Sequence, residues 1–168
     1  MRVYIYGEKI LTAVAIPVES ITPELGNLMD EMLSLMREKH GIGLAAPQIG
    51  ISQRFFVMNT GGKVRKVINP EILSSSNTTG EMDEGCLSIP GIHKKVRRSK
   101  RIIVRYLTDT GETVEEELKN YPARVFQHEF DHLNGVLFID HLSPISRKLV
   151  SHELKRLTET TTKQENTQ

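Results

Sequence analysis

Several features that would indicate a particular class of protein are scarce in this sequence or missing from it. Its 168 residues include one cysteine, Cys86, and no tryptophan, and aromatic residues make up only 5%. A single cysteine excludes an intramolecular disulfide, which fits a reducing compartment. No apolar run approaches the roughly 18 residues that a membrane-spanning helix needs. We therefore expect neither a disulfide-stabilised domain nor a transmembrane protein.

Positive and negative side chains are nearly balanced in number. The chain has 22 Lys and Arg against 21 Asp and Glu, a formal net charge of +1. We therefore expect no sequence-specific nucleic acid partner and no membrane partner. One basic run, "HKKVRRSKR" at residues 93–101, has no neighbouring aromatic residues for base stacking, and we interpret it as a solvated edge strand and turn. The first twenty residues lack the apolar core of a signal peptide, so we expect a cytoplasmic location.

Apolar periodicity and turn-forming residues predict one α+β domain. Helices are predicted at residues 22–40 and 121–133 and from Ser143 onward, and strands at 54–59, 65–70, 101–107 and 113–118. The polar segment 74–85 is predicted to be a loop. We expect mostly antiparallel sheets around a central metal-binding helix, with an N-terminal helix and a C-terminal helix. The domain is expected to cover residues 1–158, followed by a frayed tail over 159–168.

The predicted helix 121–133 contains two histidines four residues apart, with a glutamate directly after the first: His128, Glu129 and His132. At about 100° per residue these three side chains fall within one arc of the helix, and Arg124 and Asp131 fall outside that arc, on the polar side. This HExxH spacing directs two imidazoles at one metal ion and leaves the glutamate to act on a water. Two hydrogen-bonded core histidines would be the simpler interpretation, but the pairing favours a metal site.

A catalytic metal needs a third protein ligand. Downstream of His132 the candidates are His141, His152, Glu153, Glu159 and Glu165. Upstream, Cys86 lies in "EGCLSIPG" (residues 84–91), outside any core-like apolar run, and a metal would deprotonate and bind such a thiol. A buried cysteine is also an ordinary small apolar residue. The side-chain chemistry alone leaves the third ligand open.

Three segments occur in order along the chain: "GIGLAAPQIG" (41–50), "EGCLSIPG" (84–91) and "QHEFDHLNG" (127–135). Together they closely resemble the three signature motifs of the bacterial-type peptide deformylase family. The opening "YGEKIL" (6–11) also looks like the N-terminal segment of that family, so the resemblance extends roughly from residue 4 to residue 144. The family removes the N-formyl group from the initiator methionine of nascent polypeptides and releases formate.

The resemblance implies a role for each matching residue. The implied metal ligands are Cys86, His128 and His132. Water held by the metal would attack the formyl carbon, with Glu129 as general base and then general acid. Gln48 and the backbone N–H of Leu87 would stabilise the oxyanion. The family's usual physiological metal is Fe²⁺, and Zn²⁺, Ni²⁺ or Co²⁺ can occupy the same site.

The resemblance also implies how substrate binds. The implied substrate-binding residues are Ile42, Gly43, Leu44, Met82, Glu84, Gly85 and Val125. The substrates would be N-formylmethionyl peptides and nascent chains, including those at the ribosome, and we expect the enzyme to be a monomer. Some members carry arginine where this chain has His93, which leaves contacts to the second substrate residue open. We expect Asp131 to form an ion pair with Arg98.

Two other functions remain as alternatives. A zinc endopeptidase of the HExxH kind would use a downstream third ligand and a long cleft. A non-catalytic protein with a structural metal would need a closed site of four ligands, and Gln48 and Glu129 would then have no role. The metal-dependent hydrolase that the resemblance implies accounts for more of these residues than either alternative.

Overall fold

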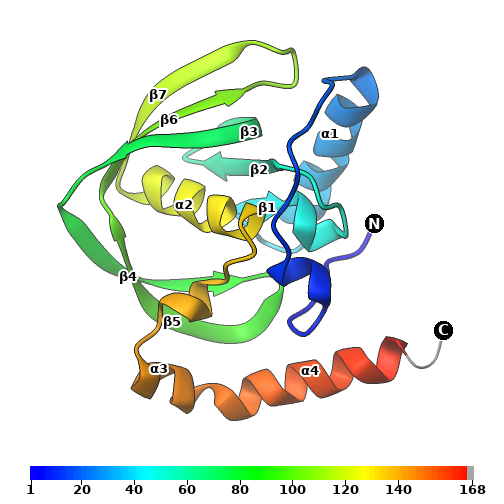
Figure 1. The fold of residues 1–168 in the computed structure, drawn as a ribbon, viewed down its shortest axis with the longest axis vertical. Helices are drawn as coiled ribbons and strands as arrows, with labels where there is room; N and C mark the ends of the chain where they lie inside the picture. The colour runs from blue at the N-terminus through cyan, green and yellow to red at the C-terminus, as the bar shows by residue number, and fades with distance from the viewer. Residues whose placement is uncertain (166–168) are drawn as a thin grey trace.

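The computed structural model describes the backbone of residues 1–165 and the side chains of residues 1–159. Two antiparallel sheets enclose the helix α2 (Tyr121–Leu133), as Figure 1 shows. The larger sheet has the order β1-β2-β3-β6-β7, with bounds Gly43–Ala45, Phe55–Thr60, Lys63–Ser75, Arg101–Leu107 and Thr113–Lys119. The smaller sheet pairs β4 (Thr79–Cys86) with β5 (Ile89–Ser99). This architecture confirms the predicted α+β class with antiparallel sheets around a central helix.

Helix α2 packs on the larger sheet through its aromatic side. The ring of Phe126 meets that of Phe56 edge to face, with centroids 5.1 Å apart, and Tyr106 lies beside it. These rings belong to a buried cluster whose members come mainly from α2 and the larger sheet. Aromatic burial of this kind fixes the helix firmly against the strands. The histidine-bearing side of α2 is thereby turned toward the smaller sheet.

Helix α1 (Pro23–Glu38) covers the other end of the large sheet and confirms the predicted N-terminal helix. Thr22 caps it, because its hydroxyl accepts a hydrogen bond from the Leu25 N–H at 3.3 Å. Pro23 occupies the first helical position, as expected. Met29, Met32 and Met36 are completely buried, so the methionine-rich stripe is core.

The prediction of a loop over residues 74–85 is wrong. Strand β3 extends to Ser75, and β4 begins at Thr79 and pairs with β5 along its length. Some polar side chains of this hairpin face solvent and pair with each other, as Glu81 and Arg97 do at 2.8 Å, whereas Glu84 and Arg98 are buried. The hairpin is held by backbone pairing rather than by alternating apolar residues, so the sequence pattern did not reveal it.

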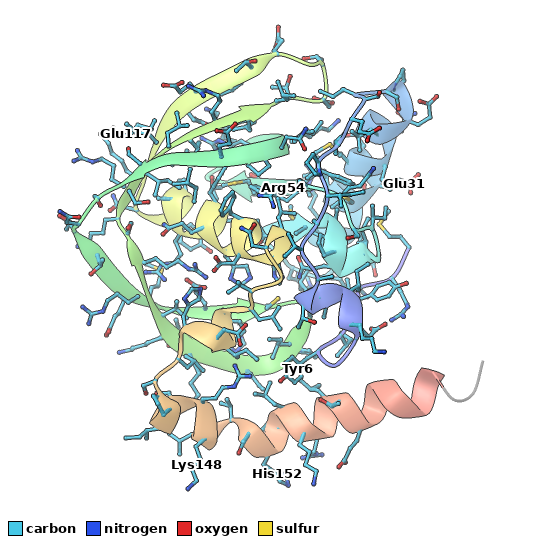
Figure 2. All side chains as sticks on the ribbon, viewed as in Figure 1. Tyr6, Glu31, Arg54, Glu117, Lys148 and His152 are labelled. Atoms are coloured by element: carbon cyan, nitrogen blue, oxygen red, sulfur yellow. The ribbon has the colours of Figure 1, made fainter. Side chains whose placement is uncertain are left out.

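The C-terminal region also differs from the prediction of a single helix. It forms α3 (Pro144–Leu149), capped by Ser143, and α4 (Ser151–Glu165), which meet at the buried Val150. Lys148 and His152 point away from the sheets (Figure 2). Helix α4 continues into the segment 159–168 that was expected to be a tail, and residues 166–168 lie outside the described part. Within the described residues, no helix is long and apolar enough to span a membrane.

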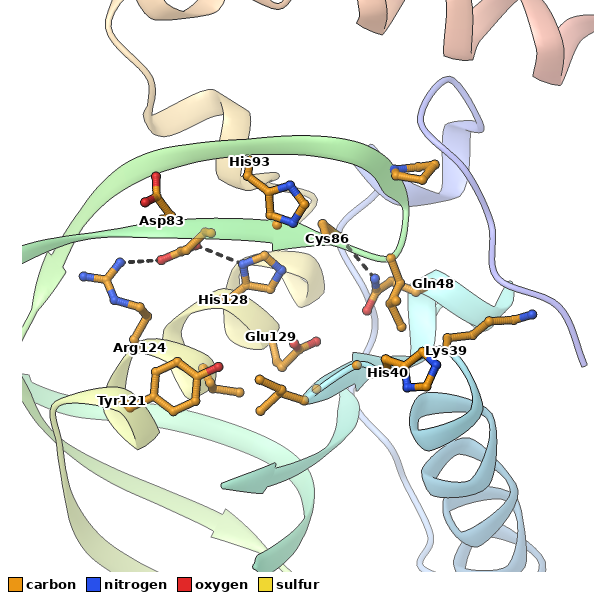
Figure 3. A pocket seen from close by; sticks show the side chains of 18 of the residues that line it. Lys39, His40, Gln48, Asp83, Cys86, His93, Tyr121, Arg124, His128 and Glu129 are labelled. Atoms are coloured by element: carbon orange, nitrogen blue, oxygen red, sulfur yellow. Dashed lines mark hydrogen bonds and ion pairs between the residues drawn. The ribbon is translucent and has the colours of Figure 1, made fainter. Parts of the chain in front are cut away.

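Three short 3₁₀ helices complete the fold: η1 (Lys9–Thr12), η2 (Ala46–Ile49) and η3 (Phe138–His141). The second of these follows β1 directly and places Gln48 next to the histidine-bearing side of α2. A cavity of about 510 Å³ lies between the edges of β1 and β4 that are not paired with another strand. Residues of α2 also line this cavity. Figure 3 shows this cavity with its lining side chains.

Candidate active site

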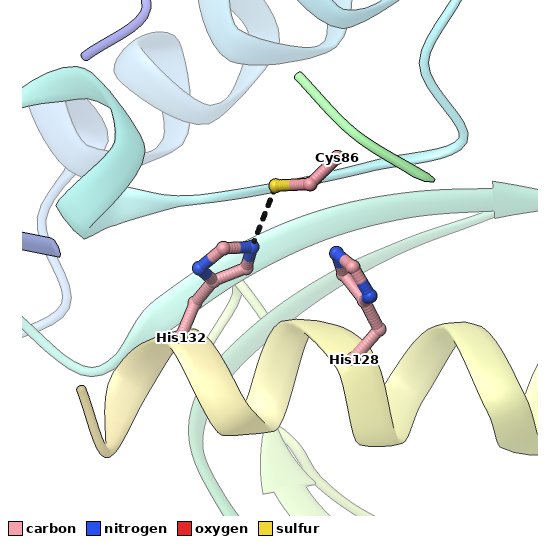
Figure 4. Close-up of side chains that lie close together, drawn as sticks. All are labelled: Cys86, His128 and His132. Carbon is pink, nitrogen blue, oxygen red and sulfur yellow. Dashed lines mark hydrogen bonds between the residues drawn. The ribbon is translucent and has the colours of Figure 1, made fainter. Parts of the chain in front are cut away.

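Cys86 and the two histidines of α2 converge beside this cavity. Their ligand atoms all lie within 4.8 Å of one another, and the Cys86 Sγ is 3.3 Å from Nε2 of His132. Figure 4 shows the thiol approaching from the end of β4 while both imidazoles rise from the helix. Among the described side chains, this is the one group of three or more such ligands that could hold a metal ion.

The downstream candidates for a third ligand lie elsewhere. His141 bonds to Asp131 at 2.7 Å, His152 points away from the sheets, and Glu153 is exposed. Glu159 is exposed and lies 4.0 Å from Lys155, whereas the side chain of Glu165 is outside the described residues. The structure thus brings the upstream cysteine, rather than a downstream residue, to the two histidines. That arrangement does not match the ligand set expected of an HExxH endopeptidase.

The donor set and its surroundings fit a divalent metal. A thiolate and two imidazoles suit either zinc or iron. Burial by itself would lower the pKa of His128, but hydrogen bonds to Cys86 and Glu84 raise it to about 10. Burial and the neighbouring charge of His128 lower the pKa of His132, so this imidazole keeps a lone pair free. The cluster therefore favours a cation, and a metal would take the place of the His128 proton.

Glu84 orients His128 from the neighbouring strand. Its carboxylate accepts hydrogen bonds from Arg98 at 2.7 and 2.9 Å and from Arg124 at 2.6 Å, and it lies 3.0 Å from Nδ1 of His128. Burial would raise the pKa of Glu84, but the bonds from His128 and Arg98 lower it well below its usual range. A fixed carboxylate on Nδ1 leaves Nε2 of His128 to face a metal. Arg98 also binds Asp131 at 2.8 Å, which confirms the expected ion pair.

Arg124 was not recognised as a site residue from the sequence. It lies on the polar side of α2, as the sequence indicated, but the β4–β5 hairpin covers that side and buries it. Its guanidinium bonds to Glu84 and to the backbone carbonyls of Val96 and Gly80, at 2.8 and 2.7 Å. The sequence does show an arginine one helical turn before His128. Its partners, however, all lie on the β4–β5 hairpin, which the sequence pattern did not predict.

Glu129 is buried beside the metal-ligand cluster, with 3% of its surface exposed. Its Oε2 has no hydrogen-bond partner among the described residues. Burial raises the pKa of this carboxyl group to about 7. Gly43 makes room for it, since a Cβ at position 43 would overlap the Glu129 carboxylate. The result is a desolvated carboxylate that faces the cavity and is free to exchange a proton.

Gln48 closes one end of the cavity. Its Oε1 accepts a hydrogen bond from the Ala45 N–H at 2.8 Å, which fixes the direction of the amide. Its Nε2 then donates to the Ser88 hydroxyl at 3.2 Å and lies 3.4 Å from the Cys86 sulfur. An amide held in this way presents a donor beside the metal-ligand cluster. Leu87, next to Cys86, also lines the cavity.

Of the residues expected to bind substrate, some line the cavity and two do not. Those that line the cavity are Ile42, Gly43, Glu84, Gly85 and Val125. Leu44 does not, because strand alternation turns its side chain into the core beneath α1. Met82 lies farther along β4, 44% exposed and beyond the lining residues. The cavity adds residues that the sequence did not suggest: Lys39, His40, Asp83, Tyr121 and Arg124.

Comparisons with known proteins identify the family of this chain. The sequence matches the polypeptide deformylase family over residues 1–148. It is 52% identical to the peptide deformylase of Thermotoga neapolitana over 153 residues, 91% of this chain and 93% of that protein. The crystal structure of peptide deformylase from Thermotoga maritima superposes with a TM-score of 0.83 at 52% identity, covering 85% of this chain and 97% of that one.

A structure of lower sequence identity superposes with a higher TM-score and over more of the chain. The Arabidopsis thaliana peptide deformylase 1B, solved with an inhibitor, gives a TM-score of 0.93 at 36% identity, covering 98% of this chain and 93% of that one. These matches extend over nearly the whole chain and confirm the fold and family that the three sequence motifs indicated. The chain therefore belongs to the polypeptide deformylase family of hydrolytic enzymes.

Proposed function

We propose that this protein removes the N-formyl group from the initiator methionine of nascent polypeptides, releasing formate. One divalent metal ion would be held by Cys86, His128 and His132. The observation that carries the proposal is the unpaired, buried carboxylate of Glu129 beside these three ligands, at the closed end of a cavity between two open strand edges. Membership of the deformylase family supports the choice of substrate.

The divalent cation would be Fe²⁺, as is usual for the family, or else Zn²⁺, Ni²⁺ or Co²⁺. When bound, it would act as a Lewis acid that polarises the formyl carbonyl and lowers the pKa of a water molecule. The protein supplies the geometry. Glu84 holds the His128 ring in place through its Nδ1, and the arginines around Glu84 keep that carboxylate charged. Such contacts behind the ligands typically set metal affinity.

Glu129 moves the proton in this proposal. It takes a proton from the attacking water and later delivers it to the nitrogen of the leaving amine, because its Oε2 has no competing partner. The Gln48 amide and the Leu87 backbone N–H donate to the oxygen on which negative charge develops. Losing one such donor typically reduces the rate by about 10²–10³-fold. The bond from the Ala45 N–H keeps the Gln48 amide pointing the right way.

The substrate would bind as an additional strand. The edges of β1 and β4 that no other strand pairs with both border the cavity, so an extended peptide can bond to backbone groups on each side. Its methionine side chain would lie against Ile42 and Val125, both cavity residues. Backbone recognition depends little on the following side chains, which suits an enzyme that serves many nascent chains.

We further propose that the protein acts as a monomer in the bacterial cytoplasm, on free N-formylmethionyl peptides and on chains still attached to the ribosome. The relative from Thermotoga neapolitana is a bacterial protein. Size-exclusion chromatography with light scattering tests the monomer directly. It should give a mass near 19.0 kDa, and twice that mass would contradict the proposal.

The function is tested with an anaerobically purified, iron-loaded protein and three substrates. Formyl-Met-Ala-Ser should yield formate, whereas acetyl-Met-Ala-Ser and an internal peptide bond in a longer peptide should remain intact by mass spectrometry. Cys86→Ala should lose both bound metal and formate release. Cleavage of the internal bond with no formate released would instead identify an endopeptidase.

A further inference from the structure

Two side chains at the mouth of the cavity have no part in the reaction described above. Lys39 and His40 follow the last residue of α1, are both exposed, and both line the cavity. Figure 3 shows them on the same side as Gln48, with Asp83 on the opposite side. We call Lys39 and His40 the basic rim.

The direction in which a bound peptide runs can be inferred from burial. Gln48 and Ala45 at one end are almost completely buried, whereas Ile42 is 38% exposed and the basic rim lies in solvent. The formyl group must lie at the closed end, because the metal ligands and Glu129 are there. A strand anchored at that end and paired with β1 can only continue from Gly43 toward Ile42 and then past the basic rim.

The spacing identifies which substrate residue reaches the rim. Strand residues advance about 3.3 Å each, so paired chains keep step residue by residue. With the formylated methionine beside Leu44 and Gly43, the next residue lies beside Ile42. The third substrate residue then lies beside Gly41, directly next to His40, the nearer member of the basic rim.

The backbone holds the rim in a defined position. His40 has a φ of +56°, a left-handed conformation that is uncommon outside glycine but enriched in histidine, asparagine and aspartate. Its N–H bonds to the Arg37 carbonyl at 3.0 Å, and the Gly41 N–H bonds to the Met36 carbonyl at 2.8 Å. These bonds end α1 with a tight turn and place both side chains at the cavity mouth.

The charge of Lys39 remains available to a substrate. Its nearest carboxylate is that of Glu38 at 3.1 Å, and the two side chains are 49% and 68% exposed, so the pair is weak. Across the cavity, the charge of Glu84 is matched by Arg98 and Arg124, while Asp83 and His93 stand at the far side. The end past which the peptide leaves therefore carries positive charge.

We propose that Lys39 and His40 are specificity-determining residues that favour an acidic side chain at the third position of the substrate. Lys39 would supply the attraction, and His40 would add a hydrogen-bond donor. The proposal rests on the deformylase function proposed above. Exposed pairs of this kind change rates modestly and depend on salt, so we expect about a three- to tenfold preference that shrinks at high ionic strength.

The test compares kcat/KM for formyl-Met-Ala-Asp, formyl-Met-Ala-Ser and formyl-Met-Ala-Lys amides at low and high ionic strength. The wild-type enzyme should rank them Asp, Ser, Lys, mainly through KM. Lys39→Glu should reverse the order. Lys9→Glu makes the same change in net charge at an exposed site outside the cavity and should keep the wild-type order. His40→Asn tolerates the left-handed turn and should reduce the preference while keeping the melting temperature.

Equal rates for the three peptides, or the wild-type order persisting in Lys39→Glu, would overturn the proposal. A wild-type preference for the lysine peptide that disappears in Asp83→Asn would also overturn it, because the chain would then leave past Asp83. Absence of formate from the serine peptide would refute the deformylase function itself, so the two failures can be told apart.

Discussion

Glu84 and His128 are joined across the interface between the β4–β5 hairpin and the central helix, with Oε2 of the carboxylate 3.0 Å from Nδ1 of the imidazole. The same carboxylate accepts hydrogen bonds from Arg98 and Arg124. Glu84 therefore positions His128, a proposed metal ligand, and is itself held in place by Arg98 of β5 and Arg124 of α2.

Replacing Glu84 by glutamine should weaken metal binding. The amide keeps the shape of the carboxylate but removes its charge, leaves two buried arginines poorly matched and holds His128 less firmly. We expect about a 10–100-fold loss in metal affinity, measured by competition with a chelator. Glu81→Gln, at an exposed position of the same strand, is the control and should bind metal like the wild type.

Replacing Arg124 by leucine should destabilise the fold. The change leaves the carbonyls of Gly80 and Val96 without this donor and removes one cation from the buried Glu84. Breaking a buried charged pair in this way typically costs about 3–5 kcal/mol. The free energy of unfolding from urea titration measures the loss. Arg97→Leu removes only an exposed pair and should cost less than about 1 kcal/mol; equal losses would contradict the structural role of Arg124.

Gly43→Ala should remove activity while the protein still folds. The new methyl group would overlap the Glu129 carboxylate and displace it from the cavity. Displacing a general base should lower kcat/KM by about 10²-fold or more. Gly26→Ala is a matched control in α1, where the nearest atom to the new Cβ is 3.8 Å away. That change should keep full activity and add up to about 1 kcal/mol of stability.

Glu116 should make stability depend on pH far from the active site. It accepts hydrogen bonds from Arg65 at 2.7 Å and from the Tyr106 hydroxyl at 2.9 Å. Burial would raise its pKa, but these bonds lower it from the ordinary 4.5 to about 2. A lowered carboxyl pKa stabilises the fold above pH 4.5, and that contribution is lost as the pH falls toward 2.

Urea unfolding of the wild type and of Glu116→Gln across this range measures the effect. The difference in unfolding free energy should be largest above pH 4.5 and should vanish near pH 2. Glu115→Gln, at an exposed neighbouring position, should show almost no difference at any pH. A difference for Glu116→Gln that grows on acidification would contradict the assignment.

The central helix could be predicted from the sequence because its pattern is local. His128, Glu129 and His132 share one helical side whatever surrounds them. The contact between Cys86 and His132 joins residues 46 apart and depends on where the β4–β5 hairpin ends. Side-chain chemistry made the cysteine a candidate, but only the family motifs singled it out before the structure was known.

The remaining errors share one physical cause. Strand β4 is polar, and it forms because its backbone pairs with β5, which no local pattern reports. The hairpin then covers the polar side of α2, and Arg124 becomes buried. Similarly, Leu44 belongs to a strand that was not predicted, so its inward direction could not be anticipated.

The proposed role of Glu129 is tested most directly by measuring formate released from formyl-Met-Ala-Ser by iron-loaded wild-type protein and by Glu129→Gln. The wild type should release one formate per peptide. Glu129→Gln should keep its metal and its melting temperature but lose about 10²–10⁴-fold in kcat. No formate from the iron-loaded wild type, or a near wild-type rate from Glu129→Gln, would contradict the account.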